Sequence, residues 1–273
     1  MKKKIKKITK CILVKLGDFL PSSKNTNVQH IYYHEVVLED GFSYDKIRFE
    51  KFKQQMHYLI DNHYNTLTFE DLNNLEGKET ANSNKNILIT FDDGYYNNYH
   101  LVYPFMKNVG LKFNVFLEVG AIGKKNEYLT WDMVKEMNES GIVNFGAHTL
   151  NHVDARFIDK QRIDNEFLLA NEIILTKVGI DVNDFCFPYG MYDNRIVKLL
   201  DELNLYKRLY TSDGRKPVKK NNIYLIGRVG IENEDNQEIF IEKINGKHNL
   251  YNQVIRNVKS ITKGYKNEVF RRN

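Results

Sequence analysis

The sequence of 273 residues has few of the features that mark a disulfide scaffold or a membrane-spanning protein. Its two cysteines, Cys11 and Cys186, lie far apart and match no metal or disulfide pattern, so the fold needs no oxidising compartment. No internal repeat is evident, and the short apolar run near the start is far below the roughly 20 residues that cross a bilayer. The remaining composition is that of a globular protein that can bury a substantial core.

Positive charge is in small excess and gathers at the two ends of the chain. The net charge is +5. The clustered basic residues are Lys2, Lys3, Lys4, Lys6, Lys7, Lys10 and Lys15 at the start and Lys259, Lys263, Lys266, Arg271 and Arg272 at the end. Basic ends are one sign of nucleic-acid binding, but no aromatic-rich surface accompanies them. We therefore interpret them as solvated tails and predict no nucleic-acid partner.

The first twenty residues resemble an export signal only in their charged start. The apolar stretch 11–14 is interrupted by Lys15, and no small-residue cleavage site follows. Five apolar residues fall at helical spacing: Ile5, Ile8, Ile12, Leu16 and Phe19. This pattern fits peripheral contact with an anionic membrane surface or a helix docked on the domain. Without an export signal, a cytoplasmic or peripheral membrane location is expected.

From residue 30 onward, short apolar strands alternate with amphipathic helices. Strands are expected at 30–34, 87–91, 113–118, 143–147, 184–187, 209–211 and 224–231, and helices at 48–63, 97–109, 130–140, 159–178 and 193–203. Repeated strand–helix units imply a parallel sheet with helices outside, and an α/β barrel of seven or eight strands fits the length better than two open sheets. We expect a loop over 71–86.

One large domain, residues 30–232, accounts for this alternation. A basic segment and linker, residues 1–29, would precede it, and a helical and basic extension, residues 233–273, would follow it. In barrels of this kind the chemistry sits at the carboxyl ends of the strands. The strand ends are therefore where functional residues are expected.

Two adjacent aspartates, Asp92 and Asp93, follow the apolar strand 87–91. One Asp before a Gly is an ordinary turn signal, but two carboxylates side by side repel each other unless a positive group lies between them. A bound cation would make their proximity tolerable, because one carboxylate could bind it while the other stayed free to accept a proton from water.

Two histidines, His148 and His152, follow another strand, 143–147. Imidazoles four residues apart can aim at one point if the residues between them form a helical turn. Alone, such a pair more often marks structural histidines. At a strand end, however, two histidines and one aspartate would supply three ligands and leave an open position for water, which is the pattern of a catalytic zinc site.

A third strand end carries the turn Pro188-Tyr189-Gly190. Proline and glycine make this turn tight, so it could aim a backbone N–H at the site as an oxyanion donor. An ordinary strand-ending turn is the alternative.

Three segments in this order and spacing, TFDDG (90–94), HTLNH (148–152) and FPYG (187–190), resemble the polysaccharide deacetylase family, the NodB-homology domain of carbohydrate esterase family four. The segment IYYHEVV (31–37) is similar to the opening strand of the biofilm-polysaccharide (poly-N-acetylglucosamine) branch, and YLTWDMVKEMNESG (128–141) is similar to the segment before the histidine motif. The resemblance covers roughly residues 30–232. It implies a distorted NodB-type barrel of seven or eight strands and a metal-dependent hydrolase that removes N-acetyl groups from a cell-surface or precursor polysaccharide.

The resemblance also implies roles for individual residues. Asp92 would be the general base, Asp93, His148 and His152 would hold a divalent metal, and the backbone N–H of Tyr189 would stabilise the oxyanion. Zinc is favoured by two imidazoles and a carboxylate, and Co²⁺ or Ni²⁺ fits the same ligands.

Two departures from the family pattern leave further roles open. At the position of Cys186, many members carry an arginine that holds the base. Many also carry a Leu-x-Leu-His motif near the end, whose histidine is the general acid. The corresponding stretch here, 224–229, contains no histidine. His34 is our candidate for an additional catalytic residue, with a structural histidine as the alternative. Arg228 would either contact substrate or pair with Asp92.

The remaining expectations concern substrate and alternatives. Thr149 would help to bind a substrate or acetate oxygen, and Trp131, the only tryptophan, would stack on a sugar ring or pack against the barrel. A hydrolase of O-acetyl esters or other C–N bonds is the alternative function. A catalytically inactive carbohydrate-binding protein is disfavoured because all four site residues are present. Family members work mostly at the cell envelope, in contrast to the missing export signal.

Overall fold

The computed structural model describes residues 28–39, 45–75, 85–159 and 162–246. The predicted basic N-terminal segment and most of the predicted C-terminal extension lie outside these ranges. The strands are β1 (Val28–Tyr33), β2 (Glu35–Val37), β3 (Lys46–Arg48), β4 (Tyr64–Leu67), β5 (Lys85–Phe91), β6 (Phe113–Leu117), β7 (Val143–Ala147), β8 (Asp184–Cys186), β9 (Arg208–Thr211), β10 (Val218–Lys220), β11 (Ile223–Gly227) and β12 (Val229–Gly230).

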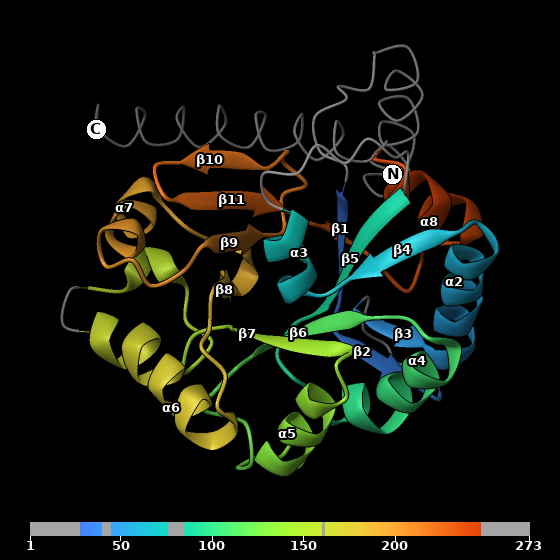
Figure 1. Cartoon of the computed structure of the whole chain (residues 1–273), viewed down its shortest axis with the longest axis horizontal. Helices are drawn as coiled ribbons and strands as arrows, with labels where there is room; N and C mark the ends of the chain where they lie inside the picture. The colour runs from blue at the N-terminus through green and yellow to red at the C-terminus, as the bar shows by residue number, and fades with distance from the viewer. Residues whose placement is uncertain (1–27, 40–44, 76–84, 160–161, 247–273) are drawn as a thin grey trace, which may run out of the picture.

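The helices lie between these strands. They are α2 (Phe49–Asp61), α3 (Phe69–Leu75), η1 (Asn98–Val102), α4 (Tyr103–Val109), α5 (Trp131–Glu139), η2 (Ala155–Phe157), η3 (Asp164–Leu168), α6 (Leu169–Val178), η4 (Pro188–Gly190), α7 (Asn194–Glu202) and α8 (Gln237–Ile244). Helices α2, α4, α5, α6 and α7 surround the sheet from outside (Figure 1). Among the helices in the described ranges, none has both the length and the apolar composition needed to span a bilayer.

One ten-stranded sheet runs in the order β10-β11-β9-β8-β7-β6-β5-β1-β12, with β4 beside β5. Its pairings are parallel except that between β10 and β11. β4 pairs with the first half of β5, and β6 pairs with its end at Thr90 and Phe91. The predicted fold class is confirmed. The strand count exceeds seven or eight because short strands join the sheet and the last predicted strand is split.

The split strand closes the barrel. β11 pairs with β9 up to Gly227, and after the single residue Arg228 the chain pairs with β1 through β12. The Arg228 N–H still donates to the Thr211 carbonyl at 2.9 Å, whereas the Ile231 N–H donates to the Tyr32 carbonyl at 3.0 Å. The strand thus changes partner at Arg228, and this residue lies on the seam that joins the two ends of the sheet.

The core follows the apolar patterns of the sequence. β5 and β6 read as continuous apolar runs because both of their faces are buried. Phe52 of α2 is fully buried and packs edge-on against Phe91, the last residue of β5, with ring centroids 5.9 Å apart. The predicted cap of α5 is confirmed, because the Thr130 hydroxyl accepts from the Met133 N–H at 3.3 Å.

Helix α3 closes the barrel at the amino-terminal ends of the strands. The free N–H groups of Phe69 and Glu70 at its start donate to the side chains of Asn114 on β6 and Asn144 on β7 at 2.8 and 2.9 Å. The predicted loop over 71–86 was therefore wrong in its first residues. The N–H groups at the start of this short helix are hydrogen-bonded by asparagines that are distant in sequence. Local periodicity therefore does not predict the helix.

A buried ion pair completes this end of the barrel. Arg208 Nε and Nη2 donate to the two carboxylate oxygens of Asp184 at 2.6 and 2.8 Å, and Nη2 also donates to the Phe69 carbonyl at 3.0 Å. Replacing Arg208 by Met would leave the Asp184 carboxylate buried without its counter-charge, and we expect a loss of about 3–5 kcal/mol in the free energy of unfolding, measured by urea denaturation.

The matched control is Arg195→Met, because Arg195 forms an exposed pair with Asp193 at 3.7 Å. Exposed pairs contribute roughly 0–1 kcal/mol, so this variant should unfold nearly as the wild type does. Equal effects of the two substitutions would contradict the role assigned to the buried pair.

Candidate active site

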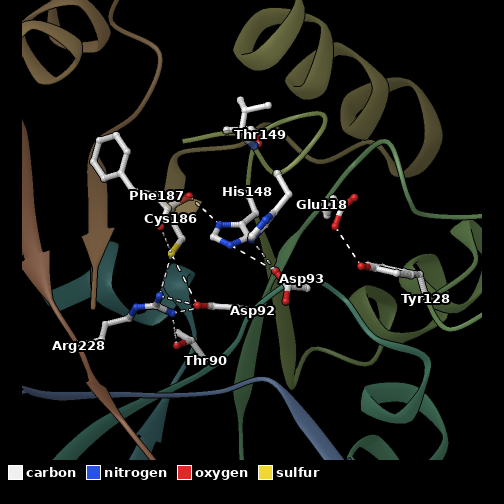
Figure 2. Close-up of polar contacts among 12 residues, drawn as sticks. Thr90, Asp92, Asp93, Glu118, Tyr128, His148, Thr149, Cys186, Phe187 and Arg228 are labelled. Atoms are coloured by element: carbon white, nitrogen blue, oxygen red, sulfur yellow. Dashed lines mark hydrogen bonds and ion pairs between the residues drawn. The ribbon is translucent and has the colours of Figure 1, made fainter. Parts of the chain in front are cut away.

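The polar groups predicted at the strand ends do converge at one end of the barrel. Asp92 and Asp93 follow β5, His148 follows β7, and Cys186 ends β8 (Figure 2). Asp92, Asp93 and His148 are buried, and His152 is partly exposed. Because these strands are neighbours in a parallel sheet, their carboxyl ends bring side chains from distant parts of the sequence together.

Asp93 and the two histidines form a group that could hold a metal ion. Asp93 Oδ1 lies 3.4 Å from His148 Nε2 and 3.2 Å from His152 Nε2, and the three candidate ligand atoms lie within 4.8 Å of one another. This oxygen is buried without a hydrogen-bond partner. A divalent cation bound by the three atoms would satisfy it, so the residues present fit such an ion.

His148 is oriented for this role by its other ring nitrogen. Its Nδ1 lies 2.7 Å from the carbonyl oxygen of Cys186. Donation of Nδ1–H to that carbonyl fixes the tautomer in which Nε2 carries a free lone pair toward Asp93.

Left-handed backbone conformations create the convergence. Asp93, Thr149, His152 and Tyr189 have φ values of 72°, 64°, 52° and 58°. A non-glycine residue in this region costs on the order of 1–3 kcal/mol, so the surrounding contacts must enforce it. The helical turn expected between His148 and His152 does not form. The two imidazoles meet because the chain reverses at Thr149 and again at His152.

The electrostatics of this group suit cation binding. Burial alone would raise the pKa of Asp93, but the nearby His152 and His148 lower it to about 2, so the carboxylate is ionised. Burial lowers the pKa of His148, which keeps that imidazole neutral. Burial also opposes the charged form of His152, yet the contact with Asp93 outweighs it and raises the pKa of His152. Protons therefore compete with a cation chiefly at His152.

Asp92 faces a different partner. Arg228 Nη1 and Nη2 donate to its two carboxylate oxygens at 2.6 and 2.8 Å, and Nη1 also donates to Thr90 Oγ1 at 2.8 Å (Figure 2). Burial opposes ionisation of Asp92, but the charge and hydrogen bonds of Arg228 lower its pKa. Of the two roles considered for Arg228, the structure shows the pairing with Asp92, and the guanidinium is only 1% exposed.

Cys186 makes room for this pairing. Its thiol is fully buried and lies 2.8 Å from Arg228 Nη2. Many members of the family that the motifs resemble have an arginine at this position, and that arginine holds the base. In this protein the guanidinium beside Asp92 comes from Arg228, and the small side chain of Cys186 leaves space for it.

His34 and Tyr189 border the group. His34 follows β1 directly beside β5, and its protonated form would contribute to lowering the pKa of both Asp92 and Asp93. Its ring is edge-on to Tyr32 with centroids 5.6 Å apart. The ring of Tyr189 is 63% exposed and contacts the His152 ring with centroids 4.6 Å apart.

Thr149 and Trp131 are placed differently. Thr149 is fully buried, and its hydroxyl accepts from the Val153 N–H at 3.3 Å. Trp131, the first residue of α5, is partly buried against the core and beside Gly123. Of the two roles considered for Trp131, the structure shows packing against the core.

Sequence reasoning missed Glu118, which follows β6. Its backbone N–H donates to the Asp93 carbonyl at 3.1 Å, and its carboxylate accepts from the Tyr128 hydroxyl at 3.1 Å and pairs with Lys125 at 3.2 Å. Glu118 directly follows an apolar strand, as Asp92 does. Its position at a strand end could therefore have marked it as a candidate site residue.

The fold and the site together define the class of protein. A parallel α/β barrel gathers two carboxylates, two imidazoles and a guanidinium at the carboxyl ends of its strands, which is the arrangement of an enzyme. Comparison with known proteins shows which family of enzymes this segment of the chain is similar to. A family model described as polysaccharide deacetylase matches residues 79–207.

Similar proteins and structures agree with that match. A Bacillus subtilis (strain 168) protein named as a polysaccharide deacetylase, YxkH, is 26% identical over 78% of this chain and 74% of its own length. The poly-beta-1,6-N-acetyl-D-glucosamine N-deacetylase of Escherichia coli (strain K12) is 22% identical, over 72% of this chain but 35% of its own length. The structure of the Streptococcus pyogenes deacetylase PplD, in complex with acetate, superposes with a TM-score of 0.71 at 20% identity, covering 80% of this chain and 97% of PplD.

The segment 79–207, which contains all three sequence motifs, matches the polysaccharide deacetylase family, and the fold is shared with PplD. The family resemblance seen in the three sequence motifs is thereby confirmed, as is the prediction of an enzyme of this class.

Removing Arg228 tests the partner of Asp92. In Arg228→Met the Asp92 carboxylate stays buried without its counter-charge, and we expect the protein to lose about 3–5 kcal/mol of unfolding free energy at neutral pH. In the wild type the lowered pKa of Asp92 contributes stability that is lost as pH falls through that pKa. In the variant the buried carboxylate should have a raised pKa, so its protonation at about pH 4 should relieve the penalty.

Urea denaturation at both pH values measures this difference. The gap between wild type and Arg228→Met should shrink on acidification, and Arg228→Lys, which keeps the charge, should show a smaller gap at neutral pH. A gap independent of pH would show that lost packing, and not the ion pair with Asp92, is what destabilises the variant.

Proposed function

We propose that this protein is a metal-dependent hydrolase that removes N-acetyl groups from a cell-surface or precursor polysaccharide. The observation that carries the proposal is the separation of two adjacent carboxylates into different surroundings. Asp93 faces two imidazoles, and Asp92 faces a buried guanidinium. One carboxylate is thus suited to bind a cation and the other to accept a proton.

Asp93, His148 and His152 would hold the ion, and zinc is favoured by this donor set, with Co²⁺ or Ni²⁺ as alternatives. When bound, such an ion polarises the acetyl carbonyl and lowers the pKa of a water molecule. The partly exposed side chain of His152 would leave room for substrate to approach an ion held there.

Asp92 acts as the general base in this proposal. The carboxylate is ionised because Arg228 lowers its pKa, so it can take a proton from the attacking water. The backbone N–H of Tyr189, in a turn fixed by its left-handed conformation, donates to the oxyanion as the acetyl carbon becomes tetrahedral. Arg228 keeps the carboxylate in place during proton transfer and does not touch the substrate.

His34 supplies the proton that the leaving amine needs. The C–N bond breaks, the sugar nitrogen receives this proton, and acetic acid leaves with the oxygen and the second proton of the water. The proton collected by Asp92 returns to His34 through solvent, which balances the cycle. Support for His34 is its place at the end of β1, the strand paired along its whole length with β5.

The substrate class follows from the relatives. The Escherichia coli protein is named for poly-N-acetylglucosamine, and PplD was captured with acetate. An N-acetylglucosamine polymer is therefore the first substrate to test, with an O-acetylated oligosaccharide beside it. Acetate released only from the O-acetylated compound would assign the site to esters.

Asp92→Asn tests the division of labour between the aspartates. The amide cannot accept the proton, so turnover of an N-acetylglucosamine oligomer should fall by about 10²–10⁴-fold. Zinc bound per chain should stay unchanged, because Asp93 and both imidazoles remain. Acetate release and elemental analysis measure the two quantities.

Asp132→Asn is the control, since Asp132 is exposed on α5. It should match the wild type in both measurements. Near-normal turnover of Asp92→Asn would remove Asp92 from the chemistry, and wild-type protein that binds zinc but releases no acetate from any acetylated glycan would overturn the proposed reaction.

His34→Gln tests the proton donor. The variant should retain zinc and lose about 10²–10⁴-fold in kcat for acetate release. His57→Gln, which removes an exposed histidine on α2, should leave kcat unchanged. An unchanged kcat in His34→Gln would make His34 structural.

A further inference from the structure

The loop that carries His152 is held from two sides by groups outside the three sequence motifs. On one side lies the chain after β6. The N–H groups of Val119 and Gly120 donate to the carbonyls of Thr149 and Leu150 at 3.2 and 2.7 Å. The approach is so close that a Cβ on Gly120 would lie 2.5 Å from the Leu150 oxygen.

On the other side lies Glu166. Its backbone carbonyl accepts from the Leu150 N–H at 3.1 Å. Its carboxylate accepts from the backbone N–H of Asn151 at 3.1 Å and from the Asn151 side-chain amide at 3.0 Å, and it pairs with Arg162 at 3.2 Å. Glu166 thereby binds the backbone N–H groups of Leu150 and Asn151, the two residues between the left-handed residues Thr149 and His152.

Glu166 is an acidic residue that the proposed chemistry does not use, and it is only 2% exposed. It lies in η3, a π-helical turn over Asp164–Leu168 that opens directly into α6. Such turns insert an extra residue into a helix and are frequent at functional sites. A buried carboxylate is costly unless it is fully hydrogen-bonded, and two of its three donors here, the backbone N–H and the side-chain amide of Asn151, belong to the loop that carries His152.

We propose that Glu166 is a positioning residue that holds the His152 loop in its left-handed conformation and thereby sets the affinity of the site for its cation. The inference rests on the metal site of the proposed function. Without Glu166 the strain at Thr149 and His152 is released, and His152 Nε2 moves away from Asp93 Oδ1. His148 keeps its place, because β7 and the Cys186 carbonyl hold it.

Glu166→Gln tests this inference with little change in shape. The glutamine removes the negative charge that the two Asn151 donors and Arg162 share, so the charge-assisted hydrogen bonds that hold the loop are weakened. We expect zinc affinity, measured by competition with a chromophoric chelator, to fall by about 10–100-fold. The visible absorption of the Co²⁺-loaded variant should also change, because one imidazole is displaced.

The swapped pair Asn151→Asp/Glu166→Gln provides the rescue. The glutamine NH₂ can donate to the new carboxylate while its oxygen accepts from the backbone N–H, so zinc affinity should return to within a few-fold of wild type. Glu172→Gln, an exposed glutamate on α6, is the matched control and should bind zinc normally.

Three outcomes separate the hypotheses. If Glu166→Gln binds zinc as the wild type does, with only its unfolding temperature lowered, Glu166 is merely structural and the inference fails while the metal site stands. Weakened binding that the swapped pair does not restore, in a folded protein, would also overturn the hydrogen-bonding account. If wild type and His152→Ala bind zinc equally, the proposed metal site itself is wrong.

Discussion

The ion pair between Arg228 and Asp92 is the interaction on which the site depends. Two adjacent carboxylates could not both remain ionised at a buried strand end without separate sources of positive charge. Arg228 neutralises one of them, and the proposed cation between Asp93 and the two histidines would neutralise the other. Arg228 is also the residue at which the last strand leaves β9 and joins β1. The same position therefore closes the barrel and holds the proposed base, so barrel closure and base orientation are linked.

Strain at the site is balanced by hydrogen bonding around it. Asp93 and Thr149 adopt a left-handed conformation, and so does His152. Each would relax if its neighbours allowed, but backbone N–H groups after β6 donate to these loops on one side, and Glu166 accepts hydrogen bonds from the His152 loop on the other. The buried polar groups of these loops are thus satisfied by each other. A site built in this way is ordered before substrate arrives, which reduces the reorganisation that the reaction requires.

The two ends of the barrel have different tasks. At the amino-terminal end, α3 lies against the Arg208–Asp184 pair, whose two side chains are buried and neutralise each other. At the carboxyl end, Asp93 retains a buried oxygen without a hydrogen-bond partner, and the well-exposed Tyr189 contacts the His152 ring. A polar group left unsatisfied costs stability, so it persists where a ligand completes it.

The alternation of apolar strands and amphipathic helices determined the α/β barrel from local sequence alone, because burial on both faces of β5 and β6 leaves a continuous apolar run. The strand ends likewise marked Asp92, Asp93, His148 and His152. Other features depended on contacts between distant residues. The first N–H groups of helix α3 donate to asparagine side chains of β6 and β7. Arg228 reaches Asp92 only because the last strand changes its pairing partner. Glu118 and Glu166 belong to no motif. Local pattern fixes which face of an element is buried, whereas the partner of a buried charge is chosen only when the chain has folded around it.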